Sequence, residues 1–208
     1  MNIFTQIENW INGPPAPDGW ATVEVAHTLA AIALAIRPNV CIEIGVFGGR
    51  SLIPVAMALK QNGSGVIHGI DPWSAGESVK GQSGKDKEWW SSQKMHQDVY
   101  ERFIANVHKL GVHNHVEIHR VTSDEYPADR GSIDLLTIDG NHGPQALVDI
   151  KRFTPHVSVG GFVYLDDLHW DGEHVSAGLD WMTERGFVKL YELGTGAILQ
   201  RVLLNTAS

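Results

Sequence analysis

Three aspartates and a histidine stand where two apolar stretches of the sequence end. Asp139 and His142 follow "LLTI" in "LLTIDGNHG", and Asp166 with Asp167 follow "FVYL". Three oxygen-bearing side chains, completed by water and substrate, suit Mg²⁺ or a similar hard cation. Histidine has an unperturbed pKa of roughly 6.5, so His142 could serve as a base near neutral pH. The same side chains could instead cap helices or bond backbone, and the pattern alone leaves both interpretations open.

A second group of residues could hold a nucleoside. The stretch "EIGVFGGRS" (43–51) places Gly45, Gly48 and Gly49 between an apolar strand and a helix, where backbone can approach a ligand closely. The spacing is not G-x-G-x-x-G, which disfavours a dinucleotide fingerprint. Asp71 ends the next strand, and an acid at that place can accept both hydroxyls of a ribose. Together these residues favour a ligand that contains a nucleoside.

The elements around these residues alternate between apolar strands and helices. Strands are expected at 39–46, 65–71, 115–121, 132–139 and 160–167, and helices at 3–11, 21–36, 51–63, 96–111, 144–157 and 173–185. Strands separated by helices imply a parallel sheet covered on both faces, and ligands of such sheets bind beyond the carboxyl ends of the strands. "FVKLYEL" and "AILQRVLL", joined by "GTG", predict a final hairpin. The sequence therefore predicts a single-domain α/β fold, a Rossmann-like doubly wound sheet that is mostly parallel.

Two regions stand apart from this alternation. Residues 1–37 are expected to form an N-terminal helical cap on a main domain at 38–208. Residues 72–95 are polar and rich in glycine and serine, and they contain Trp73, Trp89 and Trp90. A loop of that length is usually functional, and tryptophans within it favour a lid; a packed surface excursion is the alternative.

The motifs taken in order resemble those of the class I S-adenosylmethionine-dependent methyltransferases. They are "EIGVFGGRS", "GIDPW", "TSDE", "IDLLTIDGNH" and "GGFVYLDD", and the resemblance covers roughly residues 38–202. It points to small-molecule O-methyltransferases related to catechol O-methyltransferase and to enzymes that methylate sugars and natural products. It implies that S-adenosylmethionine is the cofactor, and the residues it assigns to the cofactor site are Glu43, Gly45, Phe47, Gly48, Ser51, Asp71, Ser123, Asp124 and Asp139.

The resemblance also implies a metal and a base. Metal-dependent members have an acid after the fourth strand and an acidic or amide pair after the fifth, which Asp139, Asp166 and Asp167 match. The catalytic base stands three residues after the first of these acids, commonly as a lysine, where this chain has His142. His169, with Trp170 in "DDLHW", is a second candidate base beside an aromatic wall.

Composition limits the partners of the chain. The formal net charge of −8 and the pI near 5.7 argue against nucleic acid. "TLAAIALAI" is too short to cross a bilayer, and no targeting segment is visible. A cytoplasmic protein that does not associate with a membrane is therefore expected, and it could form a homo-oligomer. Cys41 stands alone in an apolar stretch, which predicts an inert thiol. The histidines at 108, 113, 115 and 119 match no standard metal spacing and are expected to be structural or solvated.

These features predict a cation-assisted O-methyltransferase that acts on a hydroxyl of a sugar or small natural product. The alternatives are a metal-independent methyltransferase that relies on His142 or His169, a nicotinamide dehydrogenase, and a non-catalytic protein that binds a nucleoside cofactor.

Overall fold

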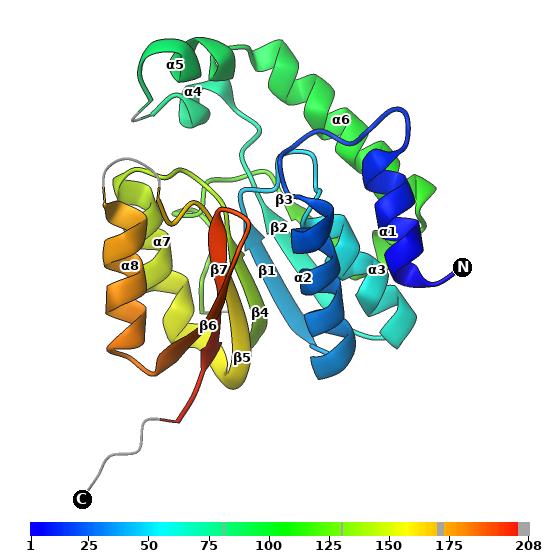
Figure 1. Ribbon diagram of the computed structural model, residues 1–208. Coiled ribbons are helices and arrows are strands. Elements are labelled where there is room, and N and C mark those ends of the chain that lie inside the picture. Colours follow the sequence, from blue (N-terminus) through cyan, green and yellow to red (C-terminus); the bar gives the residue numbers. More distant parts are fainter. Residues whose placement is uncertain (81, 130, 170–172, 204–208) are drawn as a thin grey trace, which may run out of the picture.

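The computed structural model describes residues 1–80, 82–129, 131–169 and 173–203. Within these residues one seven-stranded sheet has the order β3-β2-β1-β4-β5-β7-β6 (Figure 1). The first five strands along the chain run parallel, and β7 is antiparallel to both of its neighbours. The strands are β1 (Val40–Ile44), β2 (Val66–Ile70), β3 (Val116–His119), β4 (Ile133–Ile138), β5 (Val157–Leu165), β6 (Phe187–Leu193) and β7 (Gly196–Arg201).

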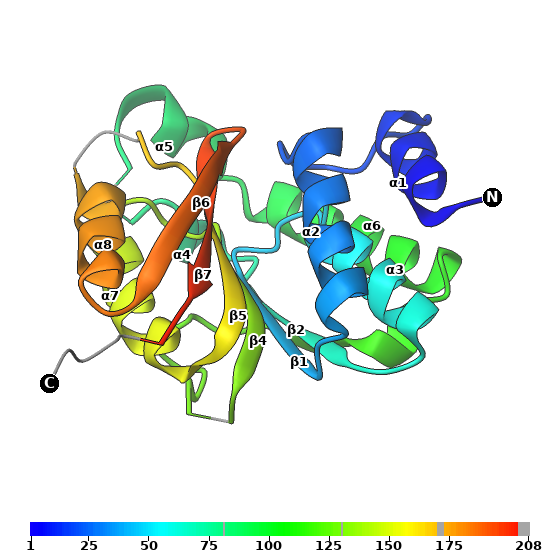
Figure 2. The same ribbon diagram turned by 60° about the horizontal axis from the view of Figure 1, so that its bottom comes forward.

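Helices cover both faces of the sheet, as the alternating sequence predicts (Figures 1 and 2). One face carries α1 (Ile3–Asn12), α2 (Val23–Ile36), α3 (Leu52–Asn62) and α6 (Gln93–Lys109), whose apolar side chains share one core. The other face carries α7 (Pro144–Phe153) and α8 (His174–Thr183), which form a second core. The doubly wound fold with a C-terminal hairpin is therefore confirmed. None of the described helices is both long and apolar enough to span a membrane.

The ends of two elements differ from the sequence prediction because of a proline. The helix expected at 144–157 ends at Phe153, and a 3₁₀ turn, η2 (Thr154–His156), follows. Pro155 has no backbone N–H to continue an α-helix, and it disfavours helical geometry in the residue before it. The strand expected at 160–167 consequently starts at Val157. A second 3₁₀ turn, η1 (His113–His115), precedes β3.

The segment 72–95 is not the continuous loop that its composition suggests. It contains α4 (Ala75–Ser78), α5 (Gly84–Trp90) and the first turn of α6, and Figure 1 shows α4 and α5 above the carboxyl ends of the strands. Trp73 is only 1% exposed and packs against Tyr100 and Phe103. The expectation that Trp73 belongs to a lid is therefore wrong, because it anchors the segment in the core.

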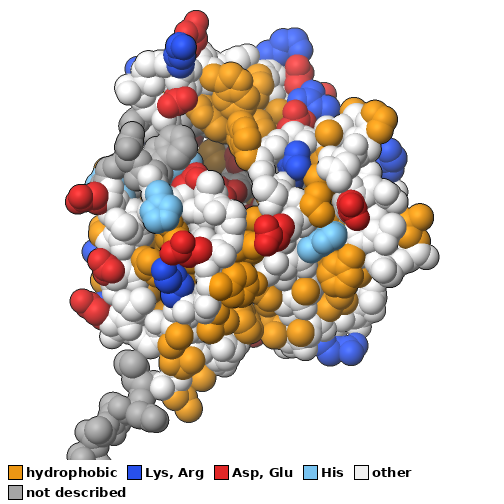
Figure 3. All heavy atoms as spheres, viewed as in Figure 1, with side chains coloured by type: hydrophobic (Ala, Val, Ile, Leu, Met, Phe, Trp, Pro, Cys, Tyr) orange, Lys and Arg blue, Asp and Glu red, His pale blue; other side chains and the backbone are white. Residues whose placement is uncertain are grey.

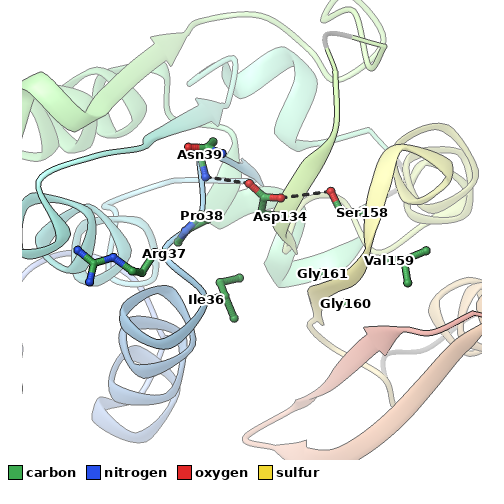
Figure 4. Close-up of a pocket in the computed structure, with 9 residues that line it drawn as sticks. All are labelled: Ile36, Arg37, Pro38, Asn39, Asp134, Ser158, Val159, Gly160 and Gly161. Carbon is green, nitrogen blue, oxygen red and sulfur yellow. Dashed lines mark hydrogen bonds between the residues drawn. The ribbon is translucent and has the colours of Figure 1, made fainter.

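The opposite end of the sheet is tied together by Asp134. Its carboxylate accepts hydrogen bonds from the backbone N–H of Asn39 at 2.8 Å and from the hydroxyl of Ser158 at 3.2 Å (Figure 4). These contacts join the starts of β1, β4 and β5 beside a small hollow of about 260 Å³. The larger cavity lies at the other end, where ligands of parallel sheets are expected.

Candidate active site

A cavity of about 1330 Å³ lies between the carboxyl ends of the strands and the segment that holds α4 and α5. In Figure 3 it is a hollow under a hydrophobic patch, with acidic side chains around its mouth. Most of the predicted site residues line it. These are Gly45, Phe47, Ser51, Asp71, Ser123, Asp124, Asp139, His142, Asp166 and Asp167.

Asp71 holds the glycine turn in shape. Its carboxylate accepts backbone N–H bonds from Val46 at 3.0 Å, Phe47 at 2.9 Å and Trp73 at 2.7 Å. Phe47 and Trp73 have φ angles of 47° and 43°, a left-handed conformation that costs energy for such residues. Burial raises the pKa of Asp71, and the backbone bonds oppose that shift. A carboxylate has about four acceptor positions, and these backbone bonds occupy three of those of Asp71.

Gly45 allows the ends of β1 and β4 to meet. Its φ is +83°, and a Cβ atom there would lie 2.0 Å from the backbone oxygen of Asp139. Only glycine fits at that distance, so this position brings the turn against Asp139. Gly48 has a different role, because a Cβ there would lie 2.2 Å from the backbone oxygen of Asp18. Gly48 therefore packs against the loop before α2 and does not line the cavity.

Glu43 lies behind the cavity wall. It is fully buried, and its Oε1 accepts a hydrogen bond of 2.9 Å from the hydroxyl of Ser51. Its Oε2 has no hydrogen-bond partner among the described residues. Burial raises the pKa of Glu43 to about 8, while the Ser51 hydrogen bond acts in the opposite direction. Glu43 therefore keeps its proton at neutral pH. It does not line the cavity itself, but it hydrogen-bonds Ser51, which does.

The three predicted metal ligands converge. Asp139, Asp166 and Asp167 each offer a carboxylate oxygen, and the three oxygens lie within 4.8 Å of one another. Parallel pairing of β4 with β5 brings them together, since Ile138 stands opposite Leu165. Burial, and then the neighbouring charge of Asp166, hold the pKa of Asp139 well above its usual range. This clustering of acids is unfavourable unless a proton or a cation lies among them.

Neighbouring hydroxyl groups fix Asp166. Its Oδ1 accepts hydrogen bonds from the hydroxyls of Tyr164 at 3.0 Å and Thr195 at 2.5 Å, and from the backbone N–H of Asp167 at 2.8 Å. These three donors fix the orientation of the Asp166 carboxylate. Tyr164 could have been found in the sequence, since it precedes Asp166 by two residues on a strand and so shares its side. Thr195 lies in the hairpin turn and gives no such signal.

The two candidate bases have different surroundings. The Nε2 of His142 lies 3.1 Å from Oδ2 of Asp167, and both residues line the cavity. Burial raises the pKa of Asp167, and His142 opposes that shift. His169 is exposed and is not among the residues that line the cavity, and its neighbour Trp170 lies outside the described residues. The structure thus brings His142, and not His169, to the acids.

The far wall of the cavity is held by side chains that the sequence analysis missed. Gln145 donates to the Ser123 hydroxyl at 3.3 Å and to a carboxylate oxygen of Asp149 at 3.0 Å, while Arg152 donates to the backbone oxygen of Ser123. Burial raises the pKa of Asp149 to about 6. Gln145 and Asp149 are four residues apart after Pro144, so helical periodicity could have placed them on one face.

Four aromatic rings cover the cavity, and we call them the aromatic roof: Trp20, Phe47, Trp89 and Trp90. Trp20 stacks on Phe47 with ring centroids 5.3 Å apart, and Trp89 meets Trp90 edge to face at 4.6 Å. Trp20 remains 66% exposed and Trp89 48%, so both present free ring surface.

Two side chains, Arg50 and Asn141, hold the aromatic roof in place. Arg50 donates to the backbone oxygens of Gly19 and Ala21, on either side of Trp20. Asn141 donates to the backbone oxygen of Lys80 at 2.7 Å and so joins the loop after β4 to the segment that carries α5. The roof is therefore built from three separate parts of the chain.

The chain is similar to a family of methyltransferase domains and to several solved methyltransferases. A family model described as a methyltransferase domain matches residues 42–168. One solved structure is the O-methyltransferase TomG from Streptomyces achromogenes, which is involved in tomaymycin synthesis and was solved with S-adenosylmethionine. It matches with a TM-score of 0.62 at 17% sequence identity, and the match covers 98% of this chain and 91% of TomG. The S-adenosylhomocysteine-bound methyltransferase PaMTH1 of Podospora anserina has a TM-score of 0.66 at 12% identity, over 98% and 88%. The O-methyltransferase NovP has a TM-score of 0.66 at 15% identity, over 95% and 88%. No curated protein matches the chain.

Proposed function

We propose that this chain, which belongs to the methyltransferase domain family, transfers the methyl group of S-adenosylmethionine to a hydroxyl oxygen of a small molecule. One observation carries the proposal. A single cavity gathers the glycine turn, the strand-end acid Asp71 and the acids after β4 and β5 under the aromatic roof. The solved O-methyltransferases of the same fold support the reaction class.

The charge of the cavity favours this cofactor. Among the described residues that line it, ten are Asp or Glu and two are Lys or Arg. S-adenosylmethionine carries a sulfonium and an ammonium group, so an acidic wall attracts it. The pyrophosphate of a dinucleotide or the backbone of a nucleic acid would meet repulsion there. The nicotinamide dehydrogenase alternative is disfavoured on this ground, and so is a nucleic-acid partner.

The same acids fit a divalent cation. Metal–oxygen bonds of about 2.0–2.6 Å separate two ligands of one ion by at most about 4–5 Å, so three oxygens within 4.8 Å can share it. Asp139, Asp166 and Asp167 would hold the cation. When bound, it would lower the pKa of the acceptor hydroxyl and fix the position of its oxygen.

His142 is the proposed base. Methyl transfer forms a C–O bond as the C–S bond breaks, and the hydroxyl proton must leave. Asp167 orients the His142 ring through the contact of 3.1 Å, so that the ring can accept that proton. The same contact supports a second candidate, a metal-independent methyltransferase in which the pair of His142 and Asp167 works alone.

The aromatic roof indicates which kinds of acceptor the cavity could bind. Exposed tryptophan rings bind flat apolar surfaces such as an aromatic ring or the C–H face of a sugar. The cavity exceeds the roughly 300–1,000 Å³ of common ligand sites, which leaves space for an acceptor beside the cofactor. A hydroxylated sugar or natural product is therefore the proposed acceptor.

Calorimetric titration with S-adenosylmethionine, with and without Mg²⁺, tests the proposal. It is paired with release of S-adenosylhomocysteine from a panel of catechols and glycosides. Wild type should bind the cofactor and turn over with Mg²⁺. Asp166→Asn should lose the Mg²⁺ dependence and most turnover, because it removes one of three charged ligands. Asp180→Asn, an exposed acid on α8, is the matched control and should behave as wild type.

Three results would change the proposal. Failure of the wild type to bind S-adenosylmethionine would refute it. Turnover unaffected by Mg²⁺ or by chelator would select the metal-independent form. Tight cofactor binding without turnover of any hydroxylated acceptor would favour a non-catalytic binding protein.

A further inference from the structure

A second group of metal-binding side chains lies on the sheet edge formed by β2 and β3. We propose that His68, Glu117 and His119 form a Zn²⁺ site distinct from the cavity. None of the three lines the cavity, and each offers one ligand atom that lies within 4.8 Å of the other two. His119 is expected from the sequence to be structural or solvated, since the spacing of the histidines from 108 to 119 matches no standard metal site. Its neighbour His68 lies 51 residues away along the chain, outside that group.

The distances between the ligand atoms match zinc geometry. The Nδ1 of His68 lies 3.2 Å from Nε2 of His119 and 3.3 Å from Oε2 of Glu117. The third distance, from Nε2 of His119 to Oε2 of Glu117, is 4.0 Å. Two ligands of a tetrahedral Zn²⁺ with bonds of about 2.0–2.1 Å are separated by about 3.3–3.4 Å. Two sides of the triangle are close to this length, and the longer third side ends on Glu117, whose side chain is 56% exposed.

Strand pairing produces this triangle. His68 stands opposite Glu117 in the parallel pairing of β2 with β3, and Ile70 stands opposite His119. Glu117 and His119 are two residues apart on one strand, so their side chains share a face of the sheet. The described residues between β3 and β4, next to the triangle, form no helix. Tyr126 closes one side of it, with its ring 4.8 Å from that of His119.

The donor atoms select the metal. Two imidazole nitrogens and one carboxylate suit Zn²⁺ and related transition ions, whereas Mg²⁺ and Ca²⁺ prefer oxygen ligands. The acids at the cavity are all oxygen donors, so the two sites differ in preference. The side chains of His68 and His119 are 15% and 21% exposed and that of Glu117 is 56% exposed. An ion can therefore enter from solvent and keep a water as fourth ligand.

The site would fasten the edge of the sheet near the cofactor. β3 is only four residues long and pairs with β2 alone. The backbone N–H of Asp71 donates to the backbone oxygen of His119 at 3.1 Å. A Zn²⁺ ion bound to side chains of both strands would therefore hold β3 beside the strand end that carries Asp71.

The proposal is tested by titrating Zn²⁺ into the metal-free full chain in the presence of excess Mg²⁺. A chromogenic chelator competes for the Zn²⁺ and reports the affinity of the protein for it. Wild type should bind one Zn²⁺ that Mg²⁺ does not displace. Substitution of a residue that only supports a metal ligand weakens metal binding by about 10–100-fold. Glu117→Gln and His119→Gln change the ligands themselves and should weaken Zn²⁺ binding by more than this. Asp166→Asn should retain it, and so should His113→Gln, an exposed histidine outside the triangle. Co²⁺ should give the visible absorption of a four-coordinate site in wild type and lose it in His119→Gln.

Two outcomes would overturn the proposal: unchanged Zn²⁺ affinity in both Glu117→Gln and His119→Gln, or loss of the tight Zn²⁺ in Asp166→Asn instead. Glu117 is exposed, so its variant should fold even if His119→Gln does not, and circular dichroism checks both. None of these measurements depends on cofactor binding. The zinc site is therefore tested independently of the proposed methyl transfer.

Discussion

Replacement of Glu43 by glutamine should change how the stability of the protein depends on pH. Glu43 is fully buried, and burial raises its pKa from the ordinary 4.5 to about 8. A carboxyl group with a higher pKa in the folded chain binds its proton more tightly there than in the unfolded chain. Between pH 4.5 and about 8, rising pH therefore lowers the free energy of unfolding.

The size of this effect follows from the pKa values. One such proton changes the free energy of unfolding by about 1.4 kcal/mol per pH unit. Between pH 5 and pH 8 Glu43 alone should thus destabilise the wild type by up to about 4 kcal/mol. Glutamine is neutral and can still accept the Ser51 hydrogen bond. Glu43→Gln should therefore be about as stable as wild type at pH 5 and clearly more stable at pH 8.

Urea unfolding at half-unit steps from pH 5 to pH 8, followed by tryptophan fluorescence in cofactor-free and metal-free protein, measures this difference. Asp71, Asp139 and Asp149 also have raised pKa values and are present in both proteins. The charge of Glu43 contributes to the raised pKa of Asp139, so its loss in the variant adds to the same difference at high pH. Glu8→Gln, at an exposed position on α1, should parallel the wild type. A constant offset between Glu43→Gln and wild type at every pH would refute the idea that Glu43 is protonated in the fold.

Three further predictions concern the cavity. Gly45→Ala should abolish S-adenosylmethionine binding, because its Cβ would lie 2.0 Å from the backbone oxygen of Asp139. Gly63→Ala is the control, since Gly63 also has a positive φ but open space around it. This control should lose about 1–2 kcal/mol of stability and keep its cofactor affinity. His142→Gln should lower kcat by about 10²–10⁴ and remove the limb of the pH–rate profile that reports the base; an unchanged profile would exclude His142 from that role. Trp90→Ala should raise the KM for the acceptor and leave cofactor affinity near wild type, as steady-state kinetics and calorimetry can show; equal loss of both would place the ring in the cofactor subsite instead.

Local patterns in the sequence predicted most elements of the fold. Apolar strands, helical spacing and the glycines and prolines between them depend on neighbours a few residues away. Thr22 caps α2 by accepting from the backbone N–H of Val25, and Gly63 ends α3 with a φ of +74°. The error after Phe153 also had a local cause, Pro155, which the sequence contained.

The cluster of three aspartates could be predicted for a different reason. In a parallel sheet the carboxyl ends of neighbouring strands meet at one edge, so a residue just after one strand lies near a residue just after the next. Asp139, Asp166 and Asp167 needed only this rule and the identity of their strands. His142 was identified by its distance from Asp139 in the chain, and the same cluster holds it.

Tertiary structure alone decided the remaining contacts. The sequence could not show that Trp73 is core while Trp89 and Trp90 cover the cavity, because all three lie in one polar segment. Nor could it show that the oxygens of Asp71 are largely used by backbone amides. Contacts between residues far apart in the chain depend on strand order, register and the path of the connections. The triangle of His68, Glu117 and His119 exists only because β2 and β3 pair in one register, which a spacing along the chain does not encode.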